Sequence, residues 1–473
     1  MPPSIPFAAT AAPAPKRAPT VQAVHASKVP TRNGSPFSTA QRRDPYWDQQ
    51  WVAGSQATWA TRNALQQRAQ LGDGRLNKRL LIDEDTALTN LTTNYARQAR
   101  QTLWAVVDSW RTISAEQVAA FTGSASLANP MAQAVASSFA VGLLDIGTLP
   151  IALQQTPAFD SRALYRPANT DAYRKLIAPT LTYPERLQIT GGYPWASGGQ
   201  YDRHNVLAAE LALRAAEHLP IGGVLGEKFS SVDLLAGSGL GRTLPKPDNR
   251  RADGVIVRPD GMRIALEITA TASTTFKQKV RRWAQLLAER PLETSGLTVL
   301  FVTAPHSDRV ESGRDPRKGV YQAIAEVLRE FPGTGRDSPA ARIGLVSWDQ
   351  WFPGRHLLSK EFFEMRADFM LEPGQRAKDK WVSKSLLTDI DFQPWKDFDA
   401  TAVLDNQGLL GATPFWFRTG DHTHLIGTPL QRAGHSIPTP VHTRPSRSRG
   451  MIVGQPRGVA TKVNLPDRLR IRG

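Results

Sequence analysis

The chain has 473 residues, of which 41% are hydrophobic, and it carries a formal net charge of +16. This length is enough for two or three globular domains. Because the sequence contains no cysteine and no apolar run of membrane-spanning length, it excludes disulfides, zinc–thiolate sites, cysteine nucleophiles and membrane spans. The amino-terminal residues lack the continuous apolar core of a secretory signal, so we expect a cytoplasmic protein.

The excess positive charge lies at the two ends of the chain. Residues 1–43 carry six Lys and Arg side chains and no acid, and residues 431–473 carry nine against the single acid Asp467. Both segments are rich in Pro, Ser, Thr and Gly, which predicts two disordered basic tails. Such tails suit the phosphate backbone of DNA, although basic tails also simply keep proteins soluble.

Residues 84–175 have the pattern of a winged helix-turn-helix domain. The sequence predicts one helix over 85–112, a second over 114–123 with a Ser–Gln capping box, and a third over 129–144. Two strands between 146 and 166 would form the wing. The preceding segment, 44–83, predicts one or two short helices that lead into this domain and dock on it.

The third predicted helix should read DNA, yet it contains no Lys or Arg. Gln133, Ser137 and Ser138 are its candidate base contacts, and Arg162 and Arg166 on the wing are candidate phosphate contacts. A winged helix that serves for packing or protein contact is the alternative, because base and phosphate readers usually carry basic side chains.

Asp253 and Glu267 lie at the ends of two β-rich runs that are joined by the turn sequence 259–261. A three-residue loop would pair Arg258 with Met262 and place Asp253 directly opposite Glu267, with about 5 Å between their Cβ atoms. Two carboxylates at that distance need a positive charge between them, and a divalent cation is the obvious candidate. A loop of two or four residues would instead put them on opposite faces as two solvated charges.

This hairpin belongs to a second unit that spans about 200–350. A helix over 204–218 opens the unit, and its i,i+4 pair Glu210 and Arg214 is expected to face solvent. Further elements follow the hairpin: a basic helix over 276–288, a strand over 297–303, a helix over 322–331 and a strand over 343–348. This order predicts an α/β sandwich, with residues 351–430 as a C-terminal extension.

The order of elements, with Asp on one strand and Glu on the next, resembles the PD-(D/E)XK restriction-endonuclease-like fold. The fuller pattern resembles the replication-relaxation family of plasmid and mobile-element proteins, which join an N-terminal winged helix to such a nuclease-like domain. The resemblance covers about 100–305. It is carried by the segments Leu103–Gly123, Tyr165–Ala168, Arg203–Asn205, Gly226–Lys228, Pro247–Val257, Ala265–Glu267 and Lys279–Trp283.

The resemblance implies a DNA-binding protein of a plasmid or phage that acts in DNA replication or mobilisation, with proteins of that machinery as further partners. In nucleases of this fold two acids hold Mg²⁺, which makes Asp253 and Glu267 the expected metal ligands and catalytic residues. A Lys two positions after the second acid normally orients the attacking water, but Thr269 stands there. Lys279 matches the family's Lys on the next helix, with Lys277 as the alternative.

Three basic residues of that helix are expected to bind DNA: Lys277, Arg281 and Arg282. A Lys-rich helix face is usually solvated, so contact with phosphate and simple exposure both remain open. Two other functions also remain open. The chain could be a non-catalytic DNA-binding accessory factor, or a structural or packaging component of a phage that binds nucleic acid through its tails.

Overall fold

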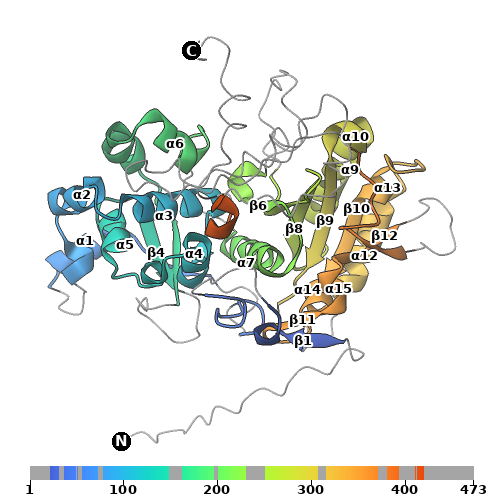
Figure 1. Ribbon diagram of the computed structural model, residues 1–473, viewed down its shortest axis with the longest axis horizontal. Helices are drawn as coiled ribbons and strands as arrows, with labels where there is room; N and C mark the ends of the chain where they lie inside the picture. The colour runs from blue at the N-terminus through green and yellow to red at the C-terminus, as the bar shows by residue number, and fades with distance from the viewer. Residues whose placement is uncertain are drawn as a thin grey trace, which may run out of the picture.

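A computed structural model describes residues 22–30, 37–48, 51, 56–72, 78–148, 162–195, 201–230, 251–306, 316–370, 381–393, 411 and 413–419. Helices and sheets are mixed throughout, and a smaller helical unit packs beside a larger sheet (Figure 1). Over these residues, no helix combines the length and the apolar character needed to cross a membrane.

The smaller unit surrounds a four-stranded antiparallel sheet with the strand order β2-β4-β5-β3. Its elements are β2 (Thr58–Ala60), α1 (Arg62–Gln70), α2 (Glu84–Thr92), α3 (Arg97–Trp110), β3 (Ile113–Ser114), α4 (Ala115–Thr122), α5 (Gln133–Ala140), β4 (Leu144–Thr148), β5 (Ala163–Pro167) and α6 (Tyr183–Thr190). Short 3₁₀ turns, at Lys78–Leu81, Ala125–Ala128 and Ala178–Thr180, connect several of these elements.

Local sequence signals explain some of these helix ends. The capping box of Ser114 and Gln117 begins α4, and Gly123 ends it with a φ of 77°. The expected helix over 85–112 is wrong as a single element, since α2 and α3 are separate. Ala96 turns the chain between them with a φ of 51°, and the buried guanidinium of Arg100 donates to backbone carbonyls of this turn.

The larger unit is built on a seven-stranded sheet with the strand order β13-β12-β10-β9-β8-β7-β6. Its main elements are α7 (Asp202–His218), β6 (Gly223–Gly226), β7 (Gly254–Val257), β8 (Arg263–Thr269), α9 (Thr274–Glu289), β9 (Leu297–Thr303), α12 (Pro316–Leu328), β10 (Ile343–Ser347), β12 (Arg366–Met370) and β13 (Trp381–Ser385). Single helical turns follow or precede the strands at Glu227–Phe229 (η6), Leu292–Ser295 (α10), Pro339–Arg342 (α13), Trp348–Trp351 (α14) and Lys360–Phe363 (α15).

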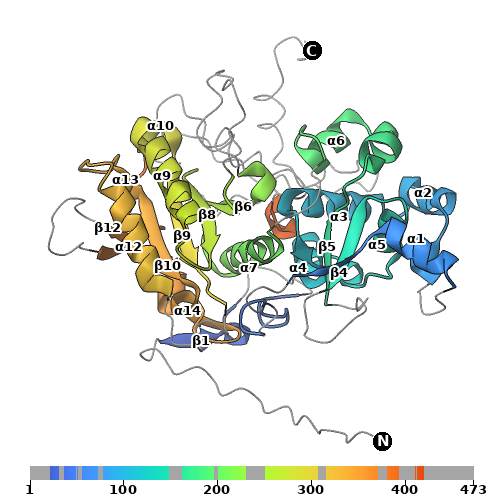
Figure 2. The same ribbon diagram turned by 180° about the vertical axis from the view of Figure 1, so that it is seen from behind.

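The pairing between neighbouring strands changes twice across this sheet, from antiparallel to parallel and back to antiparallel. Strands β6, β7 and β8 form an antiparallel meander, β8, β9 and β10 run parallel, and β12 and β13 continue antiparallel. Alternate residues of β8 face opposite layers: Ile264, Leu266 and Ile268 pack in the cluster that contains α7, whereas Ala265 packs with α9 and α12. Helix α7 therefore covers one face and α9 and α12 cover the other, as Figures 1 and 2 show.

One hydrophobic cluster is shared by the two units, while a second cluster lies on the α9 and α12 side of the large sheet. A single cluster of buried side chains runs from α3, α4 and α5 through α7 to β8, β9 and β10. Helix α7 lies between the units, and every residue from Asn205 to Glu217 is buried. Strands β12 and β13 complete the large sheet, so the first part of the expected C-terminal extension belongs to the α/β unit.

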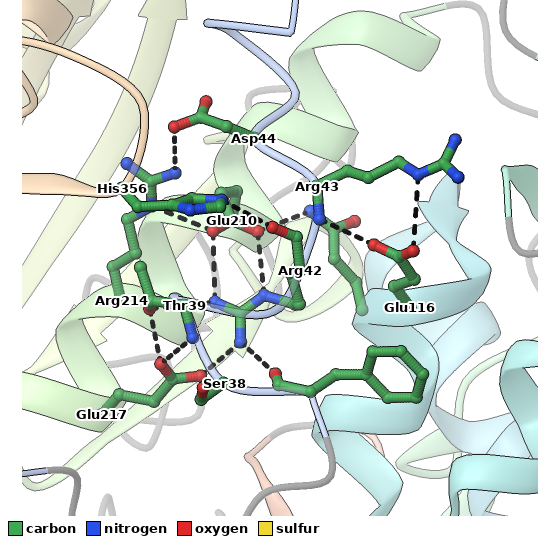
Figure 3. A network of polar contacts seen from close by, with 12 residues as sticks. Ser38, Thr39, Arg42, Arg43, Asp44, Glu116, Glu210, Arg214, Glu217 and His356 are labelled. Atoms are coloured by element: carbon green, nitrogen blue, oxygen red, sulfur yellow. Dashed lines mark hydrogen bonds and ion pairs between the residues drawn. The ribbon is translucent and has the colours of Figure 1, made fainter. Parts of the chain in front are cut away.

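The expectation that residues 1–43 form a disordered tail is wrong for the part that the structure describes. Strand β1 (Ala23–His25) pairs with β11 (Leu357–Ser359), and the Arg42 side chain is 1% exposed. Arg42 donates to Glu210, with 3.1 Å between Nη2 and Oε1, and also to Glu217 (Figure 3). Residues 1–21 and the predicted tail 431–473 lie outside the described residues.

The polar side of α7 is consequently buried, which corrects the expectation that Glu210 and Arg214 face solvent. Arg214 donates to Glu210 at 2.9 Å and to Asp44 at 2.8 Å, and all three side chains are at most 1% exposed (Figure 3). Arg42 and Asp44, which pair with Glu210 and Arg214, lie about 170 positions earlier in the sequence, in residues 37–48. The sequence of α7 alone therefore gives no indication of these partners.

Candidate functional site: two carboxylates and a lysine

The hairpin between β7 and β8 has the predicted register. Gly254 pairs with Leu266, and the Arg258 N–H donates to the Met262 carbonyl at 2.8 Å. The loop is therefore the three residues 259–261, and Gly261 supplies the left-handed conformation with a φ of 86°. The expected three-residue loop is therefore confirmed. The strand pairing ends at Gly254 and Leu266, and Asp253 lies just before it with its N–H donating to the Leu266 carbonyl at 2.8 Å, so the expected position of Asp253 directly opposite Glu267 stays a prediction.

The two carboxylates lie close together, since the charge of Asp253 acts on Glu267. Alternation along β8 puts Glu267 on the side where Ala265 packs with α9. Ser273 caps α9 by accepting from the Phe276 N–H at 3.1 Å, so only four residues separate β8 from the helix, which returns over this face.

Two side chains of α9 bind the Glu267 carboxylate. The Lys279 Nζ lies 2.6 Å from Glu267 Oε2, and the Trp283 Nε1 lies 2.6 Å from Oε1. Lys279 and Trp283 are four residues apart on one face of the helix. Glu267 is 1% exposed, whereas 42% of the Lys279 side chain is exposed, so the lysine covers the carboxylate at the protein surface.

Asp253 is held mainly by the backbone. Its Oδ2 accepts from the Ile268 N–H at 2.7 Å, and its own N–H donates to the Leu266 carbonyl at 2.8 Å. The side chain is 8% exposed. The orientation of this carboxylate is therefore fixed by the ladder of the hairpin itself.

The charges at this site affect one another. Burial raises the pKa of Glu267 to about 7; the ammonium group of Lys279 opposes this increase and the Asp253 carboxylate adds to it. Burial acts to lower the pKa of Lys279, but the charges of Glu267 and Asp253 outweigh it and the net shift is upward. Lys279 is therefore a fixed positive charge at neutral pH, while Glu267 titrates close to neutrality.

The donor set fits a hard divalent cation such as Mg²⁺. Mg²⁺ is usually held by one or two carboxylates, with waters and substrate phosphate completing its shell. Asp253 and Glu267 are such a pair, and the partly exposed Lys279 would have to leave Glu267 Oε2 to admit the ion. Within the described ranges, no three His, Asp or Glu side chains form a metal-binding group.

Three neighbouring residues at this site are not evident from the hairpin pattern. Glu227 follows β6, whose pairing of Gly226 with Gly254 brings it beside Asp253. The buried Asn205 of α7 donates its amide N–H to Glu227. Burial raises the pKa of Glu227, and the Asp253 carboxylate adds to that increase. The hydrogen bond from Trp283 was also missed, although its spacing from Lys279 could have indicated it.

The predicted DNA contacts of the smaller unit have other partners. Ser137 is fully buried and accepts a hydrogen bond from Asn90 of α2, so no base edge can reach it. Gln133 donates to Asn90 at 2.7 Å. The reason is that α2 packs over α5, which the single helix expected over 85–112 could not do. The third helix also starts at Gln133 and ends at Ala140, so it is shorter than expected.

In the β4–β5 pair, the expected wing, Arg166 is bound to the protein. It forms an ion pair with Asp145 at 3.1 Å, and its guanidinium lies 4.0 Å from the ring centroid of Trp59. Strand β2 pairs with β4 and so adds Trp59 to this sheet. Arg162 lies directly before β5 and is half-buried.

The basic side chains of α9 lie on its outer side. Lys277 forms an ion pair with Glu326 and Arg281 forms one with Glu330 at 2.5 Å, both on or next to α12. Arg282 is exposed. These three residues are thus separate from the carboxylate site, and Lys279 alone of the four predicted basic residues reaches Glu267.

The chain was compared with protein-family models, with curated proteins and with solved structures. None of the three comparisons found a match. The resemblance to the replication-relaxation family and the functions that it implies therefore stay predictions.

Proposed function

We propose that this chain is a DNA-binding protein of plasmid or phage replication or mobilisation, and that its α/β unit cleaves DNA phosphodiester bonds with Mg²⁺. The proximity of three groups carries this proposal: Lys279 binds Glu267, and the charge of Asp253 acts on both of them. Two cross-strand carboxylates beside a lysine are the combination that metal-assisted attack on a phosphate requires.

The topology of the α/β unit supports the same proposal. Helix α7 is followed by the antiparallel strands β6, β7 and β8, then by α9 and the parallel strand β9. This is the element order on which the resemblance to the PD-(D/E)XK fold rests. In that fold the two acids belong to neighbouring strands of the meander, as Asp253 and Glu267 do.

Support from the smaller unit is different in kind. Helices α3, α4 and α5 precede the β4–β5 pair, and β3 joins β5, in the order expected of a winged helix. Because α2 covers Ser137 and α5 carries no Lys or Arg, we do not assign base reading to α5. In this proposal the protein contacts the phosphate backbone of DNA, and it does so through the larger unit.

Each residue of the site has a separate role in this mechanism. Asp253 and Glu267 would hold the ion, which when bound would polarise a phosphate oxygen and activate a water. Lys279, released from Glu267, would keep its charge and orient the attacking water or stabilise negative charge on the phosphate. Trp283 would hold Glu267 in place through the hydrogen bond to its other oxygen.

A second function, DNA binding without cleavage, is favoured by one observation. The Lys279 ammonium already neutralises Glu267, so the pair of acids is electrostatically satisfied without a metal ion. The position two residues after Glu267 is occupied by Thr269, whose hydroxyl donates to the Thr271 carbonyl. In this alternative the site is a structural remnant of a nuclease and Lys279 is part of the fold.

Cleavage of supercoiled plasmid distinguishes the two functions. We expect the wild-type protein to convert supercoiled plasmid to the nicked form with Mg²⁺ or Mn²⁺, and Glu267→Gln to lose this activity. Glu326→Gln is the matched control, because Glu326 also binds a lysine of α9 but lies outside the site. Wild-type protein that binds the plasmid and leaves it intact with both ions would favour the non-catalytic function.

A further inference from the structure

A pair of stacked aromatic rings stands at the start of α7. The rings of Tyr201 and His204 are 5.9 Å apart between centroids and inclined by 26°. Tyr201 is 64% exposed, whereas His204 is half-buried beneath it. An exposed aromatic side chain is in itself ordinary on a protein surface, so what distinguishes Tyr201 is the ring stacked against it and the charged site beside it.

Hydrogen bonds to Asp202 fix the position of this pair. Asp202, the first residue of α7, accepts hydrogen bonds from Trp59 Nε1 at 3.0 Å and from Thr112 Oγ1 at 2.6 Å. Both donors belong to the smaller unit, so the start of α7 is anchored between the two units. Tyr201 is therefore presented on a rigid element.

The same pair borders the carboxylate site. His204 is close enough to Asp253, Arg203 and Lys279 for their charges to affect it, and the Tyr201 phenol affects Lys279 in the same way. A polymer whose phosphate contacts the Lys279 ammonium would lie next to the Tyr201 ring. Cations and a flat ring beside one another are the two elements of single-strand nucleic-acid recognition.

We propose that Tyr201, backed by His204, stacks an unpaired nucleobase next to the Asp253–Glu267–Lys279 site, so that the protein prefers single-stranded or locally unpaired DNA. This inference rests on the proposed function, because it takes the bound polymer to be DNA. In a duplex both faces of each base are already stacked within the helix. The ring of Tyr201 can therefore stack only on a base that lies outside the helical stack.

The test is binding measured without metal, with a short fluorescein-labelled oligothymidylate and with the same label on a duplex. We expect Tyr201→Ala to weaken oligothymidylate binding about tenfold, the size of one lost base–aromatic stack, and to leave duplex binding unchanged. Tyr201→Phe keeps the ring and should bind like the wild type. Tyr183→Ala is the matched control, since Tyr183 of α6 is 65% exposed.

The other outcomes overturn either this inference alone or the proposed function together with it. If Tyr201→Ala weakens single-strand and duplex binding equally, or if Tyr201→Phe is as weak as Tyr201→Ala, the ring does not stack a base and the inference is wrong. If Tyr201→Ala binds oligothymidylate like the wild type, the inference fails while DNA binding stands. If the wild-type protein binds neither DNA, the proposed function fails together with the inference.

Discussion

The Lys279 Nζ lies 2.6 Å from Glu267 Oε2, so a lysine ammonium occupies the place beside the carboxylate where the proposed mechanism requires a metal ion. The two cations compete for one oxygen. This competition separates the two roles that Lys279 could have, since its removal would favour metal binding even if it prevents catalysis.

Lys279→Ala should therefore bind Mn²⁺ more tightly than the wild type and yet fail to nick plasmid. The gain should be at least about tenfold, because a charge-assisted hydrogen bond contributes about 1.5–3 kcal/mol. Titration calorimetry with Mn²⁺ measures the affinity, and nicking is compared at matched DNA occupancy. Lys277→Ala is the control, because Lys277 contacts Glu326 and should affect only DNA binding. Unimpaired nicking by Lys279→Ala would refute the assignment.

Stability should depend on pH through Glu267. Its pKa in the folded protein is about 7, above the model-peptide value of 4.5, so the folded state binds this proton more tightly than the unfolded state. The corresponding stability is fully present below about pH 4.5 and is lost as the pH rises through about 7, with a total change of about 3 kcal/mol.

Urea denaturation of Glu267→Gln and of the wild type at about pH 5 and about pH 8 measures this contribution. The difference between the two proteins should shift in favour of the variant at the higher pH. The same proton competes with a metal ion, so Mn²⁺ affinity of the wild type should fall below about pH 7. A difference in stability that is constant over this range would contradict the raised pKa.

The hairpin could be predicted from sequence because its register depends on local residues. Pro259, Asp260 and Gly261 specify a three-residue loop, and counting outward from it gives the observed pairs as far as Gly254 and Leu266, next to which Asp253 and Glu267 lie. The α4 capping box was predictable for the same reason. In each case the determining residues lie within a few positions of one another.

The network around α7 could not be predicted in this way. Glu210 and Arg214 have the spacing of an exposed ion pair, and what buries them is Arg42, which lies 168 positions from Glu210. Burial of Ser137 likewise depends on α2 packing over α5. Basic residues in a Pro-rich segment are typical of a tail, and only the buried carboxylates of α7 show that Arg42 has a fixed partner.

Arg42→Met should destabilise the protein by about 3–5 kcal/mol, because it removes the guanidinium that pairs with the buried Glu217 and leaves Glu210 with Arg214 alone. Arg43→Ala is the matched control. The Arg43 side chain is 38% exposed and its ion pair with Glu116 should contribute less than about 1 kcal/mol. Urea denaturation of both variants measures the difference. Equal stability of Arg42→Met and wild type would show that residues 37–48 do not hold α7.

Deletion of residues 431–473 should weaken DNA binding without unfolding the protein. This segment contains nine Lys and Arg residues against Asp467, and each phosphate that it neutralises should add about 0.9 to the slope of log affinity against log salt concentration. Binding titrated over a series of salt concentrations gives that slope. A slope that is unchanged by the deletion would mean that these residues do not contact the DNA backbone.

We expect Asp253 and Glu267 to form a cation site which Lys279 occupies until a metal ion displaces it. Anomalous diffraction from crystals of the wild-type protein soaked in Mn²⁺ tests this expectation most directly. It should show an anomalous peak between the two carboxylates, with the Lys279 ammonium moved away from Glu267. At saturating Mn²⁺, a map with no peak at this position and with Lys279 still bound to Glu267 would contradict it.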